Sequence, residues 1–217
     1  MQGGAIRGAV RVDESVLETM REFSDIAPAH NPPYIAAMEA YMQGMADAAV
    51  EGGRHPITLR IPPIRDGAGV AREHVGQGLA AGVDAIVFPH VETAQEAALA
   101  IGSMGTDVWP SNPNGRLVNI LILEDQVAVQ NAREIVSTPG VSVAIPGPGD
   151  LRRAYEGDME AVENAIQTVL AACKEFDVPC GITAGVDDIA ERLSQGFRLI
   201  IVTSADALAV GRAAAGR

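Results

Sequence analysis

Two carboxylates in the middle of the chain stand where strand-like apolar runs end. Glu124 closes the run at 118–124, and Asp150 follows the run at 141–147. If both runs are parallel strands of a barrel, their carboxyl ends meet at the mouth and the two acids face each other there. Such a pair can act as general acid and base, or can bind a hard divalent cation such as Mg²⁺. The alternative is that each acid caps the helix that follows it.

Three further features occupy comparable positions. Arg60 lies in the strand-like run at 57–62, where a guanidinium can grip a carboxylate or steady an enolate oxygen, or can pair with a neighbouring acid. His30 ends a weaker run at 24–30, before a Pro-rich turn, and is either a general base or a structural histidine. The Pro-Gly-Pro-Gly-Asp-Leu segment at 146–151 predicts a rigid turn whose N–H groups can receive a small anion, or an ordinary loop.

The elements that must position these residues alternate along the whole chain. Strands are predicted at 5–12, 24–30, 57–62, 85–91, 118–124, 141–147, 179–184 and 197–204, with a loop at 106–115. Helices are predicted at 13–23, 33–53, 69–82, 93–104, 127–138, 157–177 and 186–196, with a closing segment at 205–216. Eight such units predict an α/β fold, a (β/α)₈ TIM barrel formed as a single domain over residues 1–217. A doubly wound open sheet is the alternative, because periodicity does not decide closure.

Composition narrows the classes of partner. The net charge is −12 and no Lys/Arg cluster occurs, so nucleic acid and anionic membrane surfaces are not expected as partners. The two cysteines, Cys173 and Cys180, do not form a metal-binding pattern and predict reduced thiols, which favours a cytoplasmic location. There is no apolar leader and no run of about 18 apolar residues, so a soluble protein is expected.

These residues carry a resemblance to a known family. Glu124 stands 26 positions before Asp150 in Gly-Pro-Gly-Asp-Leu, Arg60 lies in Leu-Arg-Ile-Pro, His30 lies upstream, and the segments at 82–97 and 106–115 add to the pattern. Over residues 28–206, approximately, the chain resembles the HpcH/HpaI aldolase and citrate lyase family, which comprises metal-dependent class II pyruvate aldolases on a (β/α)₈ barrel.

The resemblance implies an activity and a set of roles. The reaction would be reversible cleavage of a 4-hydroxy-2-oxo acid to pyruvate and an aldehyde by a homo-oligomer, usually a hexamer. Glu124 and Asp150 would bind a divalent cation, Mg²⁺, Mn²⁺ or Co²⁺. Arg60 would contact the pyruvate carboxylate or enolate, the amide of Gly149 would help hold pyruvate, and His30 would be the acid/base.

The chain departs from the family pattern in three places. Residues 27–29 read Ala-Pro-Ala where the family has an acid that orients the histidine, and Ala80 replaces a common aspartate. The loop after the fourth strand–helix unit is shortened, so that only residues 101–105 separate the helix from the segment at 106–115. Two alternatives therefore stay open: a citrate lyase beta-like enzyme acting on an acyl-CoA thioester, and a non-catalytic barrel that binds a metal and a 2-oxo acid.

Overall fold

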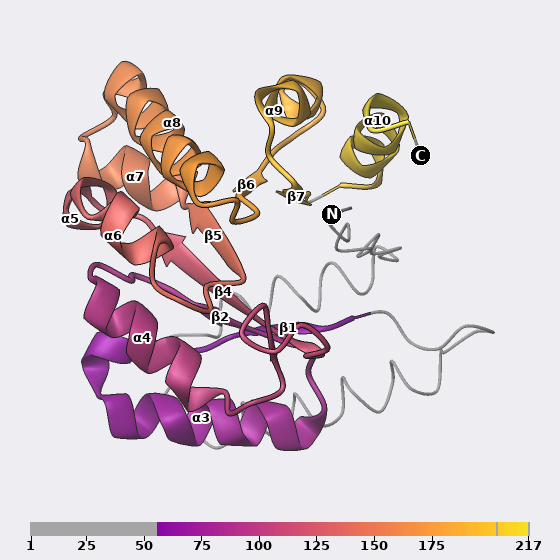
Figure 1. Cartoon of the computed structure of the whole chain (residues 1–217). Helices are drawn as coiled ribbons and strands as arrows, with labels where there is room; N and C mark the ends of the chain where they lie inside the picture. The colour runs from indigo at the N-terminus through magenta and orange to yellow at the C-terminus, as the bar shows by residue number, and fades with distance from the viewer. Residues whose placement is uncertain (1–55, 203, 217) are drawn as a thin grey trace.

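Short parallel strands alternate with helices in the computed structural model, which describes residues 56–202 and 204–216 (Figure 1). The strands are β1 (Thr58–Arg60), β2 (Ala85–Phe88), β3 (Val108–Trp109), β4 (Leu117–Leu123), β5 (Val143–Pro146), β6 (Gly181–Thr183) and β7 (Leu199–Ile201). The helices are η1 (Ile64–Asp66), α3 (Ala68–Ala81), α4 (Ala94–Ser103), α5 (Gln126–Gln130), α6 (Ala132–Val136), α7 (Pro148–Ala154), α8 (Met159–Glu175), α9 (Ile189–Gln195) and α10 (Ala205–Ala214).

The strand order follows the chain order of the predicted units. Strand β1 pairs with β2, β2 with β4 and β4 with β5, all in parallel. Strand β6 pairs in parallel with β7, and a bridge between Ala144 and Cys180 joins β5 to the start of β6. The strands predicted at 5–12 and 24–30, which would close a barrel between β7 and β1, lie outside the described residues, as do the helices predicted at 13–23 and 33–53.

Both faces of the sheet are buried. On β4, Leu121 and Leu123 belong to the large core beneath the helices, whereas Ile120 and Ile122 belong to a second cluster on the opposite face. Figure 1 shows helices α3 to α8 around the outer side of the curved sheet. Because successive side chains of a strand point to opposite faces, the second cluster fills the inside of the curve, as expected for parallel strands of a barrel.

Three local predictions were wrong. The segment predicted as a loop at 106–115 contains β3, which pairs in parallel with the start of β4. The helix predicted at 127–138 is broken at Asn131 into α5 and α6. Helix α7 forms where a turn was expected. Pro148 is compatible with this helix because it lies in the first turn, where a missing N–H removes no helical hydrogen bond.

The α/β fold with parallel strands is confirmed. Cys173 and Cys180 are both buried free thiols, as predicted. Within residues 56–202 and 204–216, no helix is long and apolar enough to cross a bilayer. The single-domain organisation over residues 1–217 stays a prediction.

Candidate active site

Glu124 owes its position to strand β4. It follows Leu123 and has the same strand parity as Ile120 and Ile122, so its side chain continues the inward-facing row at the carboxyl end of the sheet. Only 2% of the side chain is exposed. Gly147, at the end of β5, lies so close that a Cβ there would stand 2.7 Å from Cβ of Glu124. The side chain of Glu124 is therefore closely packed and does not lie on an open surface.

His90 joins this carboxylate from the neighbouring strand. Its backbone N–H donates to Oε1 of Glu124 at 2.9 Å, and its Nδ1 lies 3.3 Å from the same oxygen. Strand β2 ends at Phe88, because Pro89 has no N–H to continue the ladder. The backbone of His90 then takes a left-handed φ of 52°, which turns the residue toward β4.

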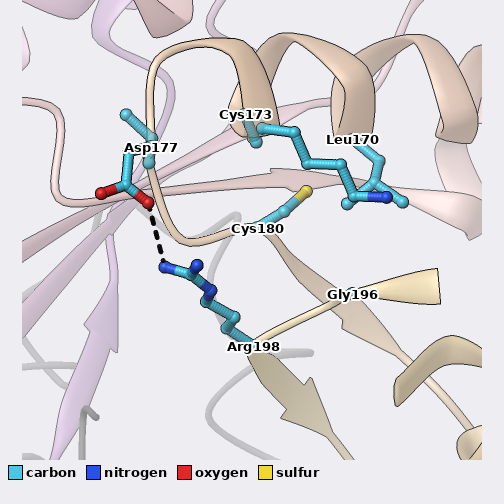
Figure 2. A pocket seen from close by; sticks show the side chains of 8 residues that line it. Leu170, Cys173, Asp177, Cys180, Gly196 and Arg198 are labelled. Atoms are coloured by element: carbon cyan, nitrogen blue, oxygen red, sulfur yellow. Dashed lines mark hydrogen bonds and ion pairs between the residues drawn. The ribbon is translucent and has the colours of Figure 1, made fainter. Parts of the chain in front are cut away.

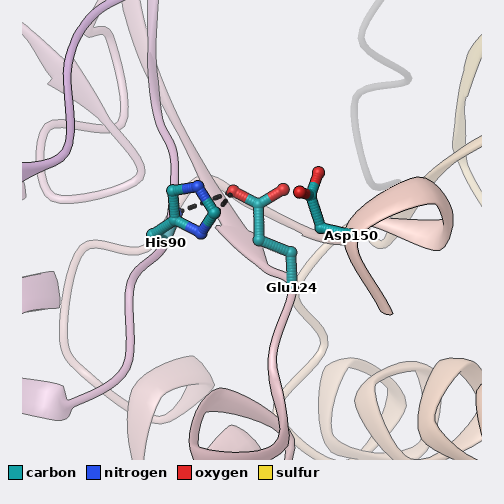
Figure 3. A group of neighbouring side chains, drawn as sticks. All are labelled: His90, Glu124 and Asp150. Atoms are coloured by element: carbon teal, nitrogen blue, oxygen red, sulfur yellow. Dashed lines mark hydrogen bonds and ion pairs between the residues drawn. The ribbon is translucent and has the colours of Figure 1, made fainter. Parts of the chain in front are cut away.

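Asp150 completes the cluster from the first turn of α7. One ligand atom from each of His90, Glu124 and Asp150 lies within 4.8 Å of the other two. In Figure 3 the carboxylate of Glu124 lies between the imidazole of His90 and the carboxylate of Asp150. Among the described residues, this is the one group of three or more His, Cys, Asp or Glu side chains close enough to share an ion.

Neither acid is a helix cap. The cap of α5 is Asp125, whose side chain accepts from the N–H of Ala128, and the cap of α7 is Gly147. Asp150 lies inside α7, where it pairs with Arg153. The capping alternative for Glu124 and Asp150 is therefore wrong, and their side chains are left to contribute to the site.

The two neighbouring carboxyl groups ionise one at a time, so that the pair carries one negative charge more readily than two. Burial, and then the neighbouring Asp150, raise the pKa of Glu124 from 4.5 to about 7. Partial burial works against ionisation of Asp150, but its interactions with Glu124 and Arg153 outweigh burial, so its pKa is lowered. The shared proton therefore resides on Glu124, and a cation placed between the two groups would displace it.

Two arginines border the cluster. The guanidinium of Arg60, at the end of β1, lies 3.6 Å from Oε1 of Glu124. Arg65 donates to Glu92 and, at 3.0 Å, to the carbonyl of His90. Burial, and then the charge of Arg65, lower the pKa of His90, which keeps the imidazole neutral at neutral pH.

The sequence predictions are placed as follows. Glu124, Asp150 and Arg60 gather at the carboxyl ends of the strands, and Gly149 lies next to Asp150 in the first turn of α7. His30 lies outside the described residues. His90 and Arg65 were missed, although one signal was available: His90 follows a strand at the same end of the sheet as Glu124.

A second hollow lies at the other end of the strands. A pocket of about 210 Å³ is formed by the end of α8 and by the residues that lead into β6 and β7 (Figure 2). Its lining includes both cysteines and Arg198, which lies 3.4 Å from Asp177. The interaction with neighbouring Cys173, and then burial, raise the pKa of Cys180, so this thiol is not a reactive nucleophile. Barrel active sites lie at the carboxyl ends of strands, so this pocket is not the candidate site.

With the fold and this geometry in place, comparison with known proteins decides the family. The sequence profile of the HpcH/HpaI aldolase/citrate lyase family matches residues 36–209. The chain belongs to this family. Similar relatives include the 5-keto-4-deoxy-D-glucarate aldolases of Salmonella arizonae, at 30% identity, and Salmonella gallinarum, at 31%. Each match covers 54% of this chain and 56% of the relative, so the chain spans about half the length of these relatives.

Several solved structures share the fold. A family member from Burkholderia cenocepacia has a TM-score of 0.67 at 22% identity, covering 94% of this chain and 88% of its own. A citrate lyase from Burkholderia xenovorans has a TM-score of 0.70 at 15% identity, with 94% and 74% covered. The citrate lyase beta subunit of M. tuberculosis, solved with oxaloacetate and magnesium, has a TM-score of 0.62 at 16% identity, with 91% and 92% covered. At these identities the likeness establishes the fold alone, which supports the barrel over the doubly wound sheet.

Proposed function

We propose that this protein is a divalent-metal-dependent aldolase that cleaves a 4-hydroxy-2-oxo acid to pyruvate and an aldehyde, reversibly. The observation that carries the proposal is the buried Glu124 carboxylate facing Asp150 at the carboxyl end of the sheet, in a chain of this family. The aldolase names of the Salmonella relatives support the same reaction class.

The residues present fit a divalent cation. Carboxylate oxygens are the ligands that Mg²⁺ and Mn²⁺ prefer, and Glu124 and Asp150 supply two within reach of one point. Burial, and then neighbouring Asp150, raise the pKa of Glu124, and a bound cation would offset both by stabilising the ionised carboxylate. Glu124 and Asp150 would hold the ion, and the choice among Mg²⁺, Mn²⁺ and Co²⁺ is part of the proposal.

The reaction then divides among the remaining side chains. When bound, the ion acts as a Lewis acid that polarises the 2-oxo group and stabilises the enolate charge. Arg60 would hold the pyruvate carboxylate or the enolate oxygen, because its guanidinium lies 3.6 Å from Glu124. The amide of Gly149, in the first turn of α7 where N–H groups lack helical acceptors, would help to hold pyruvate. His30 would take the proton of the 4-hydroxyl group.

Two alternatives keep specific support. Citrate lyases share the fold, so an acyl-CoA lyase remains a second candidate. The Ala-Pro-Ala sequence before His30 lacks an acid to orient the imidazole, which favours a barrel that binds metal and a 2-oxo acid without turnover. Turnover of free 4-hydroxy-2-oxo acids separates the aldolase from both.

The test is pyruvate release from a panel of 4-hydroxy-2-oxo acids that includes 5-keto-4-deoxy-D-glucarate, with Mg²⁺, Mn²⁺ or Co²⁺ and with EDTA. We expect metal-dependent release that Glu124→Gln and Asp150→Asn each lower by at least about 10²-fold. Asp125→Asn is the matched control: it removes a neighbouring charge, and asparagine caps a helix about as well as aspartate. Equal activity in all four proteins would refute the proposal.

The assembly and location remain proposals as well. We propose a homo-oligomer, with a hexamer as the expected state, in the cytoplasm. Light scattering that gives a monomer mass at micromolar concentration would contradict the oligomer.

A further inference from the structure

His90 is the member of the cluster whose role is unassigned. It comes from the end of β2, opposite the two carboxylates, and its imidazole faces Glu124 (Figure 3). Its Nδ1 lies 3.3 Å from Oε1 of Glu124, and about a third of its side chain is exposed. The ring therefore has both a carboxylate neighbour and room to turn.

The backbone of His90 is held on both sides. Its N–H donates to Glu124 at 2.9 Å, and its carbonyl accepts from Arg65 at 3.0 Å. These two contacts fix the peptide units around a residue whose φ is 52°, a conformation that few non-glycine residues adopt. The residue is thus fastened to the carboxylate by its main chain, and its side chain is directed to the same place.

We propose that His90 is a third protein ligand of the metal, which makes the site a nitrogen–oxygen–oxygen set that favours Co²⁺ or Zn²⁺ over Mg²⁺. The inference rests on the proposed metal-binding role of Glu124 and Asp150 and deepens it. Sites made of carboxylate and water oxygens suit Mg²⁺ and Mn²⁺, whereas an imidazole ligand adds affinity for later transition metals. One side chain therefore sets the selectivity of the site.

The geometry allows this with small movements. Adjacent ligands of an ion with bonds of about 2.1 Å lie roughly 3 Å apart, and opposite ligands lie about 4.2 Å apart. The ligand atoms of His90, Glu124 and Asp150 lie within 4.8 Å of one another, with His90 and Glu124 already at 3.3 Å. The partly exposed side chains of His90 and Asp150 would rotate to reach these spacings, whereas Glu124 is buried and would stay in place.

The competing role is a purely structural one, in which the imidazole only supports Glu124. The two roles differ in what they do to different ions. A support acts on Glu124, a ligand to every ion, so its loss weakens Co²⁺ and Mg²⁺ alike. A nitrogen ligand strengthens mainly the binding of ions that prefer nitrogen, so its loss reduces the preference of the site for Co²⁺ over Mg²⁺.

The experiment measures Co²⁺ and Mg²⁺ binding to the full metal-free chain by titration calorimetry, using the chloride salts. For His90→Ala we expect Co²⁺ affinity to fall by at least about 10-fold, with Mg²⁺ affinity changed by less than about threefold. His90→Gln keeps a polar side chain but replaces nitrogen with an amide oxygen, and it should narrow the Co²⁺ preference as well. His30→Ala is the matched control, since it removes the other histidine assigned to the site, and it should leave the preference unchanged.

A spectroscopic readout makes the test direct. Electron spin echo modulation from bound Mn²⁺ should show an imidazole nitrogen that is present in His30→Ala and absent in His90→Ala. Equal losses for Co²⁺ and Mg²⁺, or no loss for either, would overturn the role of His90 while leaving the proposed aldolase intact. Failure of the unaltered protein to bind any of these ions would instead overturn the proposed metal-dependent function itself.

Discussion

Gly147→Ala perturbs the site without replacing a charged residue. The backbone of Gly147 has φ −88°, which alanine adopts freely, so the effect of the substitution comes from the steric contacts of the added Cβ atom. A Cβ at this position would stand 2.7 Å from Cβ and 2.8 Å from Oε2 of Glu124, and 3.2 Å from Cγ2 of Ile122. Carbon atoms in ordinary contact are about 3.5–4.0 Å apart, so Glu124 or the backbone must move by about 1 Å.

The expected magnitudes follow from that displacement. Overpacking of this kind costs about 1–3 kcal/mol of unfolding free energy, because the Cβ of Glu124 is close to the main chain and cannot swing aside. A misplacement of about 1 Å at a site can lower turnover by about 10²-fold. We therefore expect a folded Gly147→Ala protein with weakened metal binding and a loss of pyruvate release of that order.

Urea unfolding, metal titration and pyruvate release on one preparation test this reasoning. Gly149→Ala is the matched control, because its Cβ would meet nothing within 4 Å, it lies in helix α7, and the backbone amide is retained. The control should be as stable as the parent protein and should bind metal equally. Normal metal binding and turnover in Gly147→Ala would show that the fitted contact with Glu124 does not matter.

Three other perturbations have defined outcomes. Burial raises the pKa of Glu124 from 4.5 to about 7, so the folded metal-free protein holds this proton more tightly than the unfolded chain. The free energy of unfolding should therefore fall by up to about 3 kcal/mol as the pH rises from 4.5 to above 7. Urea titrations in which Glu124→Gln shows the same fall would contradict this. Arg65→Gln should change the unfolding free energy by less than about 1 kcal/mol but lower pyruvate release about tenfold, because the carbonyl of His90 loses its donor; unchanged turnover would refute this. Leu121→Ala, fully buried in β4, should cost about 2–5 kcal/mol in urea unfolding, whereas the exposed Val127→Ala should stay within about 0.5 kcal/mol, and similar losses in both would contradict the assigned core.

The position of Glu124 could be predicted because it depends on local rules. A continuous apolar run predicts a buried parallel strand, and an acid directly after it falls at the carboxyl end of the sheet. Arg60 followed from the same rule. The alternation of strands and helices likewise predicted the order of the described strands other than β3.

The missed features depend on contacts between distant residues. His90 was read as part of a strand at 85–91, because the run of apolar residues hid the stop at Pro89. Histidine is enriched among non-glycine residues with positive φ, but that preference does not locate this turn. The backbone of His90 is held by Arg65 and Glu124, which lie 25 and 34 positions away. Helix α7 was read as a turn because Pro and Gly signal turns, although Pro is also favoured in the first turn of a helix.

Exchange of the C3 protons of pyruvate for deuterium, followed by NMR in D₂O, tests the central claim most directly, because enolisation needs no aldehyde partner. We predict exchange that requires a divalent cation, stops with EDTA, and is lost in Glu124→Gln and Asp150→Asn but retained in Asp125→Asn. A protein that binds metal and pyruvate without exchange, or exchange that survives both substitutions, would contradict the account.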